Sequence, residues 1–265
     1  MKIAIAIFGI PRGSIITSGS LFDNIIRPSQ EVGEVVLFGH LFDKKHITNI
    51  RSGESGQLSS DDYIRFAEFK PILEEPEICL EKWDFNFFKK FGDLENDKFQ
   101  SIKNLIHQLH SLYSTTVLIE ATNPDVVIYA RPDLLYHQPI NNNLIELASQ
   151  NKKRIYIPEW QWWNGYNDRF AICGSEAYKI YGYRLIQAKT YCIQNNVPLH
   201  AERLLRFALA KNKLSIRTMK TKASRVRTGN VIKPENFNEI ETLGTDSRRL
   251  KIELRFLQVL SHLNI

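Results

Sequence analysis

Arg131 and Asp133 flank Pro132 directly after a run of apolar and aromatic residues at 126–129. Four such residues without polar alternation are typical of a strand that is covered on both faces, as in an α/β sheet. Pro132 has no N–H and ends the ladder, and it keeps Arg131 extended. We therefore expect a cation and a carboxylate at the carboxyl end of a central strand, where open α/β sheets bind ligands. The alternative is that Asp133 caps a turn and pairs with Arg131 at the surface.

Two other apolar runs, residues 3–8 and 34–38, are also predicted strands that end in polar turns. After the first run, Gly9 lets a ligand approach the backbone, and Arg12 can hold a phosphate through two N–H groups. His40 follows the second run. The first turn has neither the spacing of a Walker A loop nor that of a G-x-G-x-x-G fingerprint, and a purely structural role for Gly9 is the alternative.

Residues 159–170 form an aromatic and polar loop. Its candidate binding residues are Trp160, Trp162, Trp163, Tyr166, Asn167, Asp168 and Arg169. Aromatic faces stack on the C–H faces of sugars, and carboxylates accept hydrogen bonds from sugar hydroxyls. This composition predicts a sugar-binding loop, and the alternative is a buried aromatic cluster. The loop's polar backbone argues against complete burial.

The remaining patterns predict the elements that position these residues. Apolar side chains at helical spacing indicate a long helix at 97–120 between two strands, which is a parallel crossover. The predicted fold class is therefore α/β, a Rossmann-like, mostly parallel sheet flanked by helices. On the long helix, His107 and His110 are expected at the surface, because no third metal ligand is near in the sequence. Further strands are expected at 77–80 and 154–158, loops at 44–70 and 234–245, and helices at 20–26, 140–150, 175–194, 200–210 and 246–263.

The 265 residues suffice for one large domain, or for one domain with a C-terminal appendage. We expect a main domain at 1–215, followed by a basic segment and an amphipathic helix at 216–265. The chain has no apolar run of 18 residues, and the run at 3–8 leads to no cleavage site. Three widely spaced cysteines match neither a disulfide framework nor a zinc site. These features favour a cytoplasmic protein.

The basic character is concentrated in one segment. Ten Lys or Arg residues and no acidic residue lie between Arg203 and Lys233, whereas the rest of the chain has 25 basic and 29 acidic residues. Such a segment favours binding to phosphates of nucleic acid or contact of residues 203–265 with an anionic membrane. The segment matches no nucleic-acid motif, and a solvated basic face is the further alternative.

The order of these motifs resembles GT-A-type glycosyltransferases of bacterial and viral surface-polysaccharide synthesis. The resemblance covers roughly residues 1–215. It rests on a G-x-x-R turn at 9–12, a strand ending at His40, the Gln108–Tyr113 pattern, the R-P-D-L sequence at 131–134, the N-D-R-F sequence at 167–170 and a glutamate-bearing helix at 200–205. Tyr129 replaces the first arginine of the R-x-R-P-D-L pattern. Each motif alone has low specificity.

This resemblance implies transfer of a sugar from a nucleotide-sugar donor to a glycan or lipid-linked acceptor. It implies donor binding by Gly9, Arg12, His40, Arg131 and Asp133, and sugar or acceptor binding by the aromatic loop. Asp133 takes the place of the D-x-D motif, which implies a divalent cation, manganese or magnesium. Arg131 stands at the first acidic position of that motif, so the cation is in question, and Arg131 itself can neutralise the diphosphate.

The glycosyltransferase function that the resemblance implies also indicates candidate catalytic residues. An inverting transfer needs a general base, for which Asp168 is the first candidate and Glu202 the second. A retaining transfer needs no such base, and the sequence does not decide between the two. The alternative function is a non-catalytic protein that binds glycan or nucleic acid, using the basic segment at 203–233.

Overall fold

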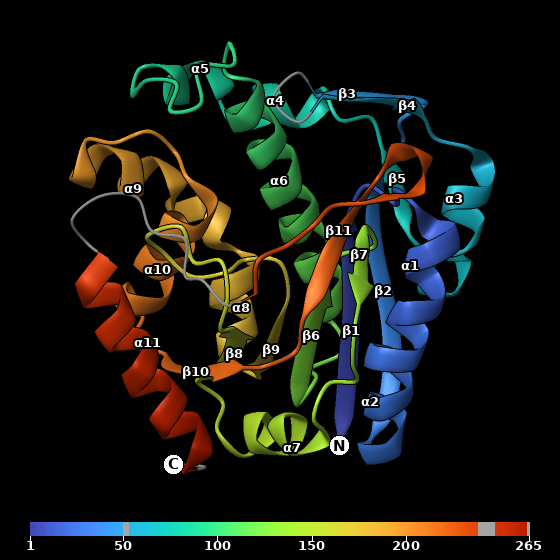
Figure 1. The fold of residues 1–265 in the computed structure, drawn as a ribbon, viewed down its shortest axis with the longest axis vertical. Helices are drawn as coiled ribbons and strands as arrows, with labels where there is room; N and C mark the ends of the chain where they lie inside the picture. Colours follow the sequence, from blue (N-terminus) through green and yellow to red (C-terminus); the bar gives the residue numbers. More distant parts are fainter. Residues whose placement is uncertain (50–52, 238–246, 264–265) are drawn as a thin grey trace.

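A seven-stranded sheet lies at the centre of the computed structural model, which describes residues 1–49, 53–237 and 247–263 (Figure 1). The strand order is β10-β8-β9-β6-β1-β2-β5. Only β9 among these strands runs antiparallel to its neighbours. This topology confirms the predicted α/β class with a mostly parallel sheet. The strands are β1 (Lys2–Gly9), β2 (Glu34–Phe42), β5 (Ile72–Glu74), β6 (Val126–Ala130), β8 (Arg154–Pro158), β9 (Ala171–Gly174) and β10 (Ser215–Met219).

Helices cover both faces of the sheet, and the two-residue period of β1 shows which helices lie on each face. Ile3, Ile5 and Ile7 pack in one apolar cluster with α1 (Ser14–Leu21) and α7 (Asn142–Gln150). Ala4, Ala6 and Phe8 pack in a second cluster with α6 (Gln100–Glu120) and α8 (Ala177–Gly182). Because both faces are covered, β1 and β6 are apolar throughout, as the sequence predicted.

A third apolar cluster builds a helical layer outside α6. It joins α6 to α4 (Ile78–Lys82), α5 (Phe85–Lys89), α9 (Ala188–Asn195) and α10 (Ala201–Lys211). The strand predicted at 77–80 is wrong, because these residues belong to α4 and bury Cys79. The sheet strand in this region is β5, a three-residue edge strand with exposed Ile72 and Leu73, which offers too short a pattern to detect.

Most predicted helices form, with changes at their ends. The helix at 97–120 is α6, and the helix at 200–210 is α10. The helix predicted at 20–26 is part of a longer run, in which a π-helical turn connects α1 to α2 (Arg27–Val32). The helix predicted at 175–194 is interrupted between α8 and α9 by a 3-10 turn, Arg184–Gln187.

The long loop predicted at 44–70 contains a hairpin of β3 (His46–Asn49) and β4 (Glu54–Gln57), followed by α3 (Ser60–Ile64). Its strands are short and polar, so the sequence lacks the apolar alternation that marks a strand. Much of the loop predicted at 234–245 lies outside the described residues.

The last fifth of the chain joins the main sheet. β10 is the edge strand beside β8, so the predicted boundary after residue 215 falls at its start. β11 (Ala223–Arg227) pairs with β7 (Leu134–Tyr136) and β12 (Val231–Ile232). The C-terminal helix α11 (Ser247–His262) adds Leu250, Leu254 and Leu257 to the second core cluster. No helix of the described residues is long and apolar enough to cross a membrane.

Candidate active site

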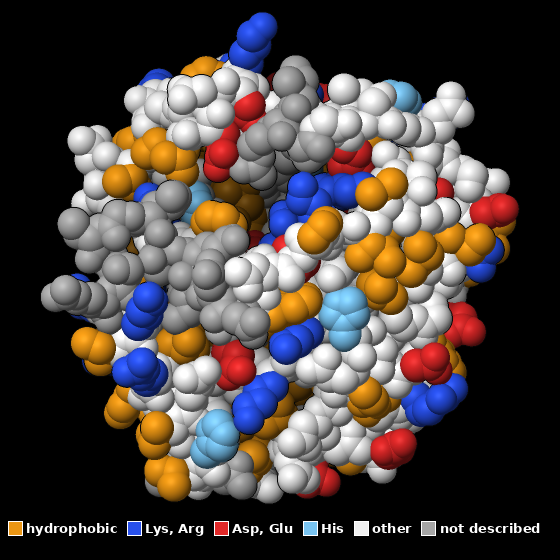
Figure 2. Space-filling model, viewed as in Figure 1, with side chains coloured by type: hydrophobic (Ala, Val, Ile, Leu, Met, Phe, Trp, Pro, Cys, Tyr) orange, Lys and Arg blue, Asp and Glu red, His pale blue; other side chains and the backbone are white. Residues whose placement is uncertain are grey.

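A cavity of about 500 Å³ opens at the carboxyl edge of the sheet. Its lining comes from the turn after β1, the end of β6, the β3–β4 hairpin, the first half of α6, the aromatic loop, the start of α10 and the end of β11. Figure 2 shows this hollow near the centre of one face, with Lys and Arg side chains at its rim. The parallel register places β1, β2 and β6 in phase, so their polar turns meet here.

One side of the cavity carries five arginines, which we call the arginine wall. They are Arg12, Arg131, Arg169, Arg225 and Arg227. The turns after β1 and β6, the aromatic loop and β11 supply them, so the wall is assembled from segments far apart in the sequence. Arg225 and Arg227 alternate with buried Val226 along β11, which points both toward the same face.

Asp133 is held between two of these arginines. Arg131 Nε donates to Asp133 Oδ1 and Arg131 Nη2 to Oδ2, each at 2.8 Å, and Arg12 Nη2 also donates to Oδ2. The carboxyl group is only 2% exposed. Burial opposes its ionisation, but Arg131 and Arg12 outweigh burial and hold the pKa of Asp133 well below its usual range. The carboxylate is therefore ionised and surrounded by N–H donors.

Glu54 is a second buried carboxylate of the arginine wall. Arg12 Nη1 donates to Glu54 Oε2 at 2.8 Å, and Arg227 Nη1 donates to the same atom at 3.1 Å. The backbone N–H of Thr228 donates to Glu54 Oε1 at 3.0 Å. Glu54 thereby connects the β3–β4 hairpin to the end of β11.

Glu235 is the third carboxylate in contact with the arginine wall. Arg225 Nε donates to Glu235 Oε1 at 2.7 Å, and Arg169 Nη1 lies 3.7 Å from the same oxygen. The guanidinium of Arg169 lies over the ring of Trp160, 4.9 Å from its centroid. Burial and the neighbouring Arg225 lower the pKa of Arg169 to about 10. Its contacts with Glu235 and Trp160 therefore do not fully offset the loss of hydration and the charge of Arg225.

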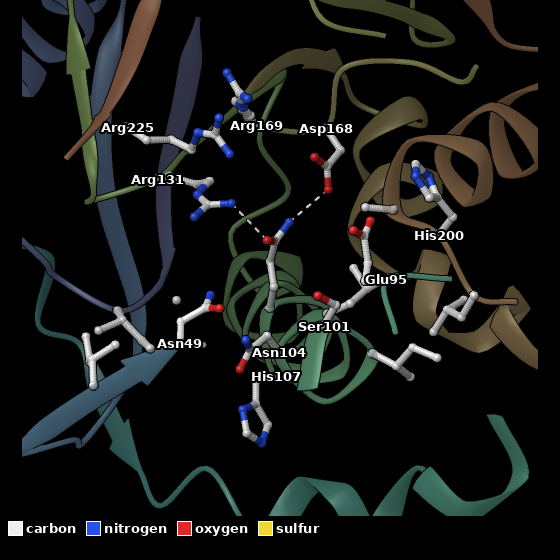
Figure 3. Close-up of a pocket in the computed structure, with 18 of the residues that line it drawn as sticks. Asn49, Glu95, Ser101, Asn104, His107, Arg131, Asp168, Arg169, His200 and Arg225 are labelled. Atoms are coloured by element: carbon white, nitrogen blue, oxygen red, sulfur yellow. Dashed lines mark hydrogen bonds between the residues drawn. The ribbon is translucent and has the colours of Figure 1, made fainter. Parts of the chain in front are cut away.

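Four acidic residues also line the cavity, and we call them the carboxylate wall. They are Asp93, Glu95, Asp168 and Glu202. In Figure 3, Glu95 and Asp168 lie across the cavity from Arg131, Arg169 and Arg225. Burial and the charge of Asp168 raise the pKa of Glu202 well above its usual range. An acidic residue with a raised pKa is suited to accept a proton near neutral pH.

Gln108 bridges the two walls from α6. Arg131 Nη1 donates to Gln108 Oε1 at 2.8 Å, and Gln108 Nε2 donates to Asp168 Oδ2 at 2.8 Å (Figure 3). Arg184 Nη2 also donates to Asp168 Oδ2, at 3.2 Å. Asp168 is therefore fixed by two donors, whereas Glu202, whose side chain is 17% exposed, contacts His200 Nδ1 at 3.3 Å.

The start of α10 and the aromatic loop approach each other closely beside Glu202. The backbone N–H of Tyr166 donates to Glu202 O at 3.0 Å. A Cβ atom at Gly165 would lie 2.1 Å from the backbone carbonyl of Glu202, so only glycine fits there. The loop thus positions the first turn of α10 and its carboxylate.

Within the aromatic loop, the predicted sugar-binding residues separate into two groups. Trp163 and Arg169 line the cavity. Trp160 and Trp162 are buried, and their indole N–H groups donate to the carbonyls of Thr221 and Pro158. The remaining two also stabilise the loop, because Asn167 Nδ2 donates to Trp160 O at 2.7 Å and the Tyr166 hydroxyl donates to Glu253. Trp163 is thus the tryptophan that can meet a ligand.

His40 is absent from the cavity lining and lies in a group with buried His110 and partly exposed Glu74, which we call the histidine cluster. One potential ligand atom from each of the three lies within 4.8 Å of the others. The prediction that His107 and His110 lie at the surface is wrong: both are buried, because α6 is covered by β2 on one side and by α4 on the other. Ser111 connects the cluster to the site by accepting a hydrogen bond from the Gly9 N–H at 2.8 Å.

Hydrogen-bond partners assign the protons of the histidine cluster. Trp83 Nε1 donates to His110 Nδ1 at 2.9 Å, so a neutral His110 carries its proton on Nε2 and donates to Glu74 Oε1 at 2.9 Å. The Ser111 hydroxyl donates to His40 O at 2.6 Å, so His40 Nδ1 donates to Ser111 Oγ. His40 Nε2 then faces Glu74 Oε2 at 3.0 Å. This contact is a hydrogen bond when either His40 Nε2 or the Glu74 carboxyl group carries a proton.

Neither the surroundings of Asp133 nor the histidine cluster fits a divalent cation in the arrangement that the structure shows. Three N–H groups occupy the Asp133 carboxylate, and the neighbouring side chains are cations, whereas manganese and magnesium need free oxygen ligands. In the histidine cluster, a metal at His110 Nε2 would displace a proton while Trp83 still donates to Nδ1. That ring would then have no proton on either nitrogen.

The sequence did not single out Glu54, Arg225, Arg227 or Glu235 as site residues. Arg225 and Arg227 were visible only as members of the basic segment, although their spacing of two on a strand could have indicated a shared face. Glu54 and Glu235 lie in polar stretches without any local signal. Their roles depend on contacts with residues more than ten positions away or on other elements.

No protein-family model matches the sequence, and no curated protein matches it. Solved structures of similar chain course include mouse xyloside xylosyltransferase 1 in its apo form, with TM-score 0.43 and 10% identity over 83% of this chain and 85% of that chain. Galactosyltransferase LgtC in complex with donor and acceptor sugar analogues has TM-score 0.43 and 13% identity over 82% and 73%. A Bacillus anthracis protein provisionally assigned as a glucose-1-phosphate thymidylyltransferase, in complex with sucrose, has TM-score 0.42 and 10% identity over 86% and 91%. These likenesses are too distant to carry a functional argument, and we take the function from the site.

Proposed function

We propose that the protein is a glycosyltransferase that uses a nucleotide-sugar donor. The observation that carries the proposal is that the arginine wall and the carboxylate wall line one cavity, in which Glu95 and Asp168 lie across from three of the arginines (Figure 3). A nucleotide sugar has the matching polarity, because its diphosphate is anionic and its sugar ring gains positive charge as the glycosidic bond breaks. The position at the carboxyl edge of a parallel sheet agrees with this class of ligand.

The proposed reaction forms a bond between an acceptor hydroxyl oxygen and the anomeric carbon of the donor sugar. The bond from that carbon to the diphosphate oxygen breaks, and the nucleoside diphosphate leaves with the electron pair. In an inverting transfer, Glu202 takes the acceptor proton, because its pKa is raised and it is less constrained than Asp168. Asp168, fixed by Gln108 and Arg184, orients the sugar hydroxyls and stabilises the developing positive charge. Trp163 supplies an aromatic face for a sugar ring.

The test is turnover of UDP-, GDP- and CDP-sugars with a panel of simple glycosides and lipid-linked glycans as acceptors. We expect release of nucleoside diphosphate and a glycosylated product from one donor class. Glu202→Gln should lower the rate by about a hundredfold or more while nucleotide binding persists. In the inverting case the rate should rise with pH through the raised pKa of Glu202, because a general base must be ionised. Binding of nucleotide without turnover of any donor would favour the non-catalytic alternative.

We further propose that α11 brings the enzyme to an anionic membrane, where lipid-linked acceptors lie. Opposite its packed face, α11 exposes Ile252, Phe256 and Val259, with Lys251 and Arg255 beside them. Apolar side chains beside basic ones favour an interfacial position on anionic lipid. Co-sedimentation with phosphatidylglycerol vesicles should be lost in Phe256→Ser and should be absent with phosphatidylcholine vesicles. Equal binding to both vesicles would contradict the electrostatic part of the proposal.

The nucleic-acid alternative has less support in the structure. Arg225 and Arg227 of the basic segment line the cavity, and Arg206 donates to Glu253 of α11 at 2.5 Å. These side chains are therefore engaged inside the fold, so the segment presents fewer cations to an extended phosphate backbone than its sequence suggests.

A further inference from the structure

We propose that the arginine wall itself neutralises the diphosphate of the donor, so that the site binds nucleotide without a divalent cation. This inference rests on the proposed glycosyltransferase function and specifies how that site recognises its donor. In this arrangement Asp133 is a positioning residue that holds Arg12 and Arg131.

The charges of the arginine wall match a diphosphate. Among the described residues, the five arginines of the wall contact three carboxylates, Asp133, Glu54 and Glu235, so this contact group has a net charge of +2. Asp168 and Glu202 act on Arg131 and Arg169 from elsewhere in the cavity without an ion pair to them. The diphosphate of a nucleotide sugar carries one negative charge on each phosphate, so its binding would neutralise the wall. A divalent cation added at the same place would instead leave four positive charges against two negative charges.

Donor groups are also available on the wall. Among the described side chains, Arg12 Nε, Arg169 Nη1 and Arg227 Nε are buried without a hydrogen-bond acceptor. Arg12 and Arg169 are 9% and 6% exposed, and both line the cavity. Buried N–H groups without acceptors destabilise the folded protein, and phosphate oxygens are acceptors of suitable charge and number.

The electrostatics of the arginine wall agree with this inference. Burial and the neighbouring Arg12 lower the pKa of Arg227 to about 10. Burial and Arg225 similarly lower the pKa of Arg169 to about 10. Both arginines are thus less stable as cations than an ordinary arginine, which is the expected state of a cationic site before its anion binds.

Rigidity explains why arginine can take the place of a metal ion here. Asp133, Glu54 and Gln108 hold the planar guanidinium groups of Arg12 and Arg131 through several N–H groups at once. Oriented donors that need no rearrangement stabilise charge as it develops on a leaving group. A lysine at these positions would lack the fixed fork geometry.

The test is a thermal-shift and calorimetric titration of the full chain with inorganic pyrophosphate, UDP, GDP and CDP, in EDTA and in manganese. We expect pyrophosphate and one nucleoside diphosphate to bind in EDTA, and manganese to leave the affinity unchanged. Binding of a nucleoside diphosphate only with manganese would overturn this inference and leave the proposed function intact. Binding of pyrophosphate but of no nucleoside diphosphate would support the wall and contradict the donor class. Failure of every probe in both conditions would overturn both proposals.

Variants make the test specific to the wall. Arg131→Met and Arg225→Met should each weaken metal-free binding by about tenfold to a hundredfold, which is the usual effect of losing charged hydrogen bonds. The matched control is Arg27→Met, because Arg27 is an exposed arginine of α2, and it should change affinity by less than about twofold. Equal losses in all three variants would overturn the inference.

Asp133→Asn tests whether the carboxylate is needed to bind a cation or only to position Arg12 and Arg131. The amide keeps the shape and one acceptor oxygen while removing a negative charge beside Arg12 and Arg131. If Asp133 only positions these arginines, a folded Asp133→Asn protein should bind pyrophosphate in EDTA at least as tightly as the wild type. Loss of pyrophosphate binding in a variant with unchanged circular dichroism would overturn the positioning role.

Discussion

The arginine wall and the histidine cluster lie on either side of the same stretch of α6, and they balance buried charge in different ways. Gln108 contacts the arginine wall, whereas His110 belongs to the histidine cluster. Arginine keeps its proton under all ordinary conditions, so each carboxylate of the wall compensates a permanent charge. Histidine can become neutral, so the histidine cluster can lose its charge instead of requiring a partner. The difference predicts that the wall is sensitive to mutation and the cluster to pH.

The largest expected effect is the loss of Asp133. Asp133→Ala leaves Arg12 and Arg131 buried without their shared carboxylate, which should lower the free energy of unfolding by on the order of 3–5 kcal/mol. The measurement is urea denaturation at pH 7, with Asp133→Asn as the milder control. A loss below about 1 kcal/mol would show that the two arginines find other partners or water.

The second effect is a pH dependence that comes from three buried histidines: His40 and His110 of the histidine cluster, and His107, which lines the cavity. Burial and the charge of Lys44 lower the pKa of His107 to about 4, and burial also lowers the pKa of His40 and His110. Below pH 6.5 the unfolded chain therefore binds protons that the folded chain does not, so stability decreases as the pH falls. His107 alone should lower the free energy of unfolding by on the order of 3 kcal/mol when the pH falls from 7 to its pKa in the folded protein.

Thermal unfolding between pH 7 and pH 4 measures this dependence. His107→Leu should flatten the curve, whereas His46→Gln, which changes an exposed histidine of β3, should leave it unchanged. Asp133 adds little to the slope above about pH 5, because its carboxylate is ionised in both the folded and the unfolded chain there. Its contribution begins only near pH 4, where the unfolded group takes up a proton while Arg131 and Arg12 keep the pKa of the folded group far lower. An identical slope in His107→Leu and the wild type would contradict the assignment.

The smallest expected effect is the loss of the Glu74 carboxylate, which has the same place in the histidine cluster as Asp133 has in the arginine wall. Glu74→Gln removes the carboxylate of the histidine cluster, but His40 and His110 can be neutral, so the expected loss at pH 7 is about 1 kcal/mol. The same urea denaturation measures it. A loss as large as that of Asp133→Ala would mean that the histidines are permanently charged, and would remove the distinction between the two regions.

The sequence predicts the strands of this site better than the contacts between them. The apolar run before Arg131 indicated a buried strand, and Pro132 marked its end, because both signals are local. The partners of Asp133 are a different matter, since Arg12 is 121 residues away. The local pattern did indicate the pair with Arg131 and put a metal at Asp133 in question, but it could not indicate the second arginine or the burial of the pair.

Two other regions show where sequence patterns are insufficient. Trp160 and Trp162 follow a strand in a polar loop, yet they are buried, because their indole N–H groups find backbone carbonyls inside the fold. Glu74 lies on a short edge strand and meets His40 and His110 only after β5 pairs with β2 and α6 packs over them. Both outcomes depend on tertiary contacts that spacing does not encode.

The contact of Glu54 with Arg227 has a consequence for the order in which the protein is made. These residues are 173 positions apart, and Arg12 meets Glu54 in the same group. β1, β2 and β6 are synthesised early and can pair while the ribosome is still adding the last quarter of the chain. The cavity, however, lacks two of its five arginines until β11 has emerged. A nascent chain can therefore have most of its sheet while it still lacks a complete site, and the capacity to bind an anion should arise only near the end of translation.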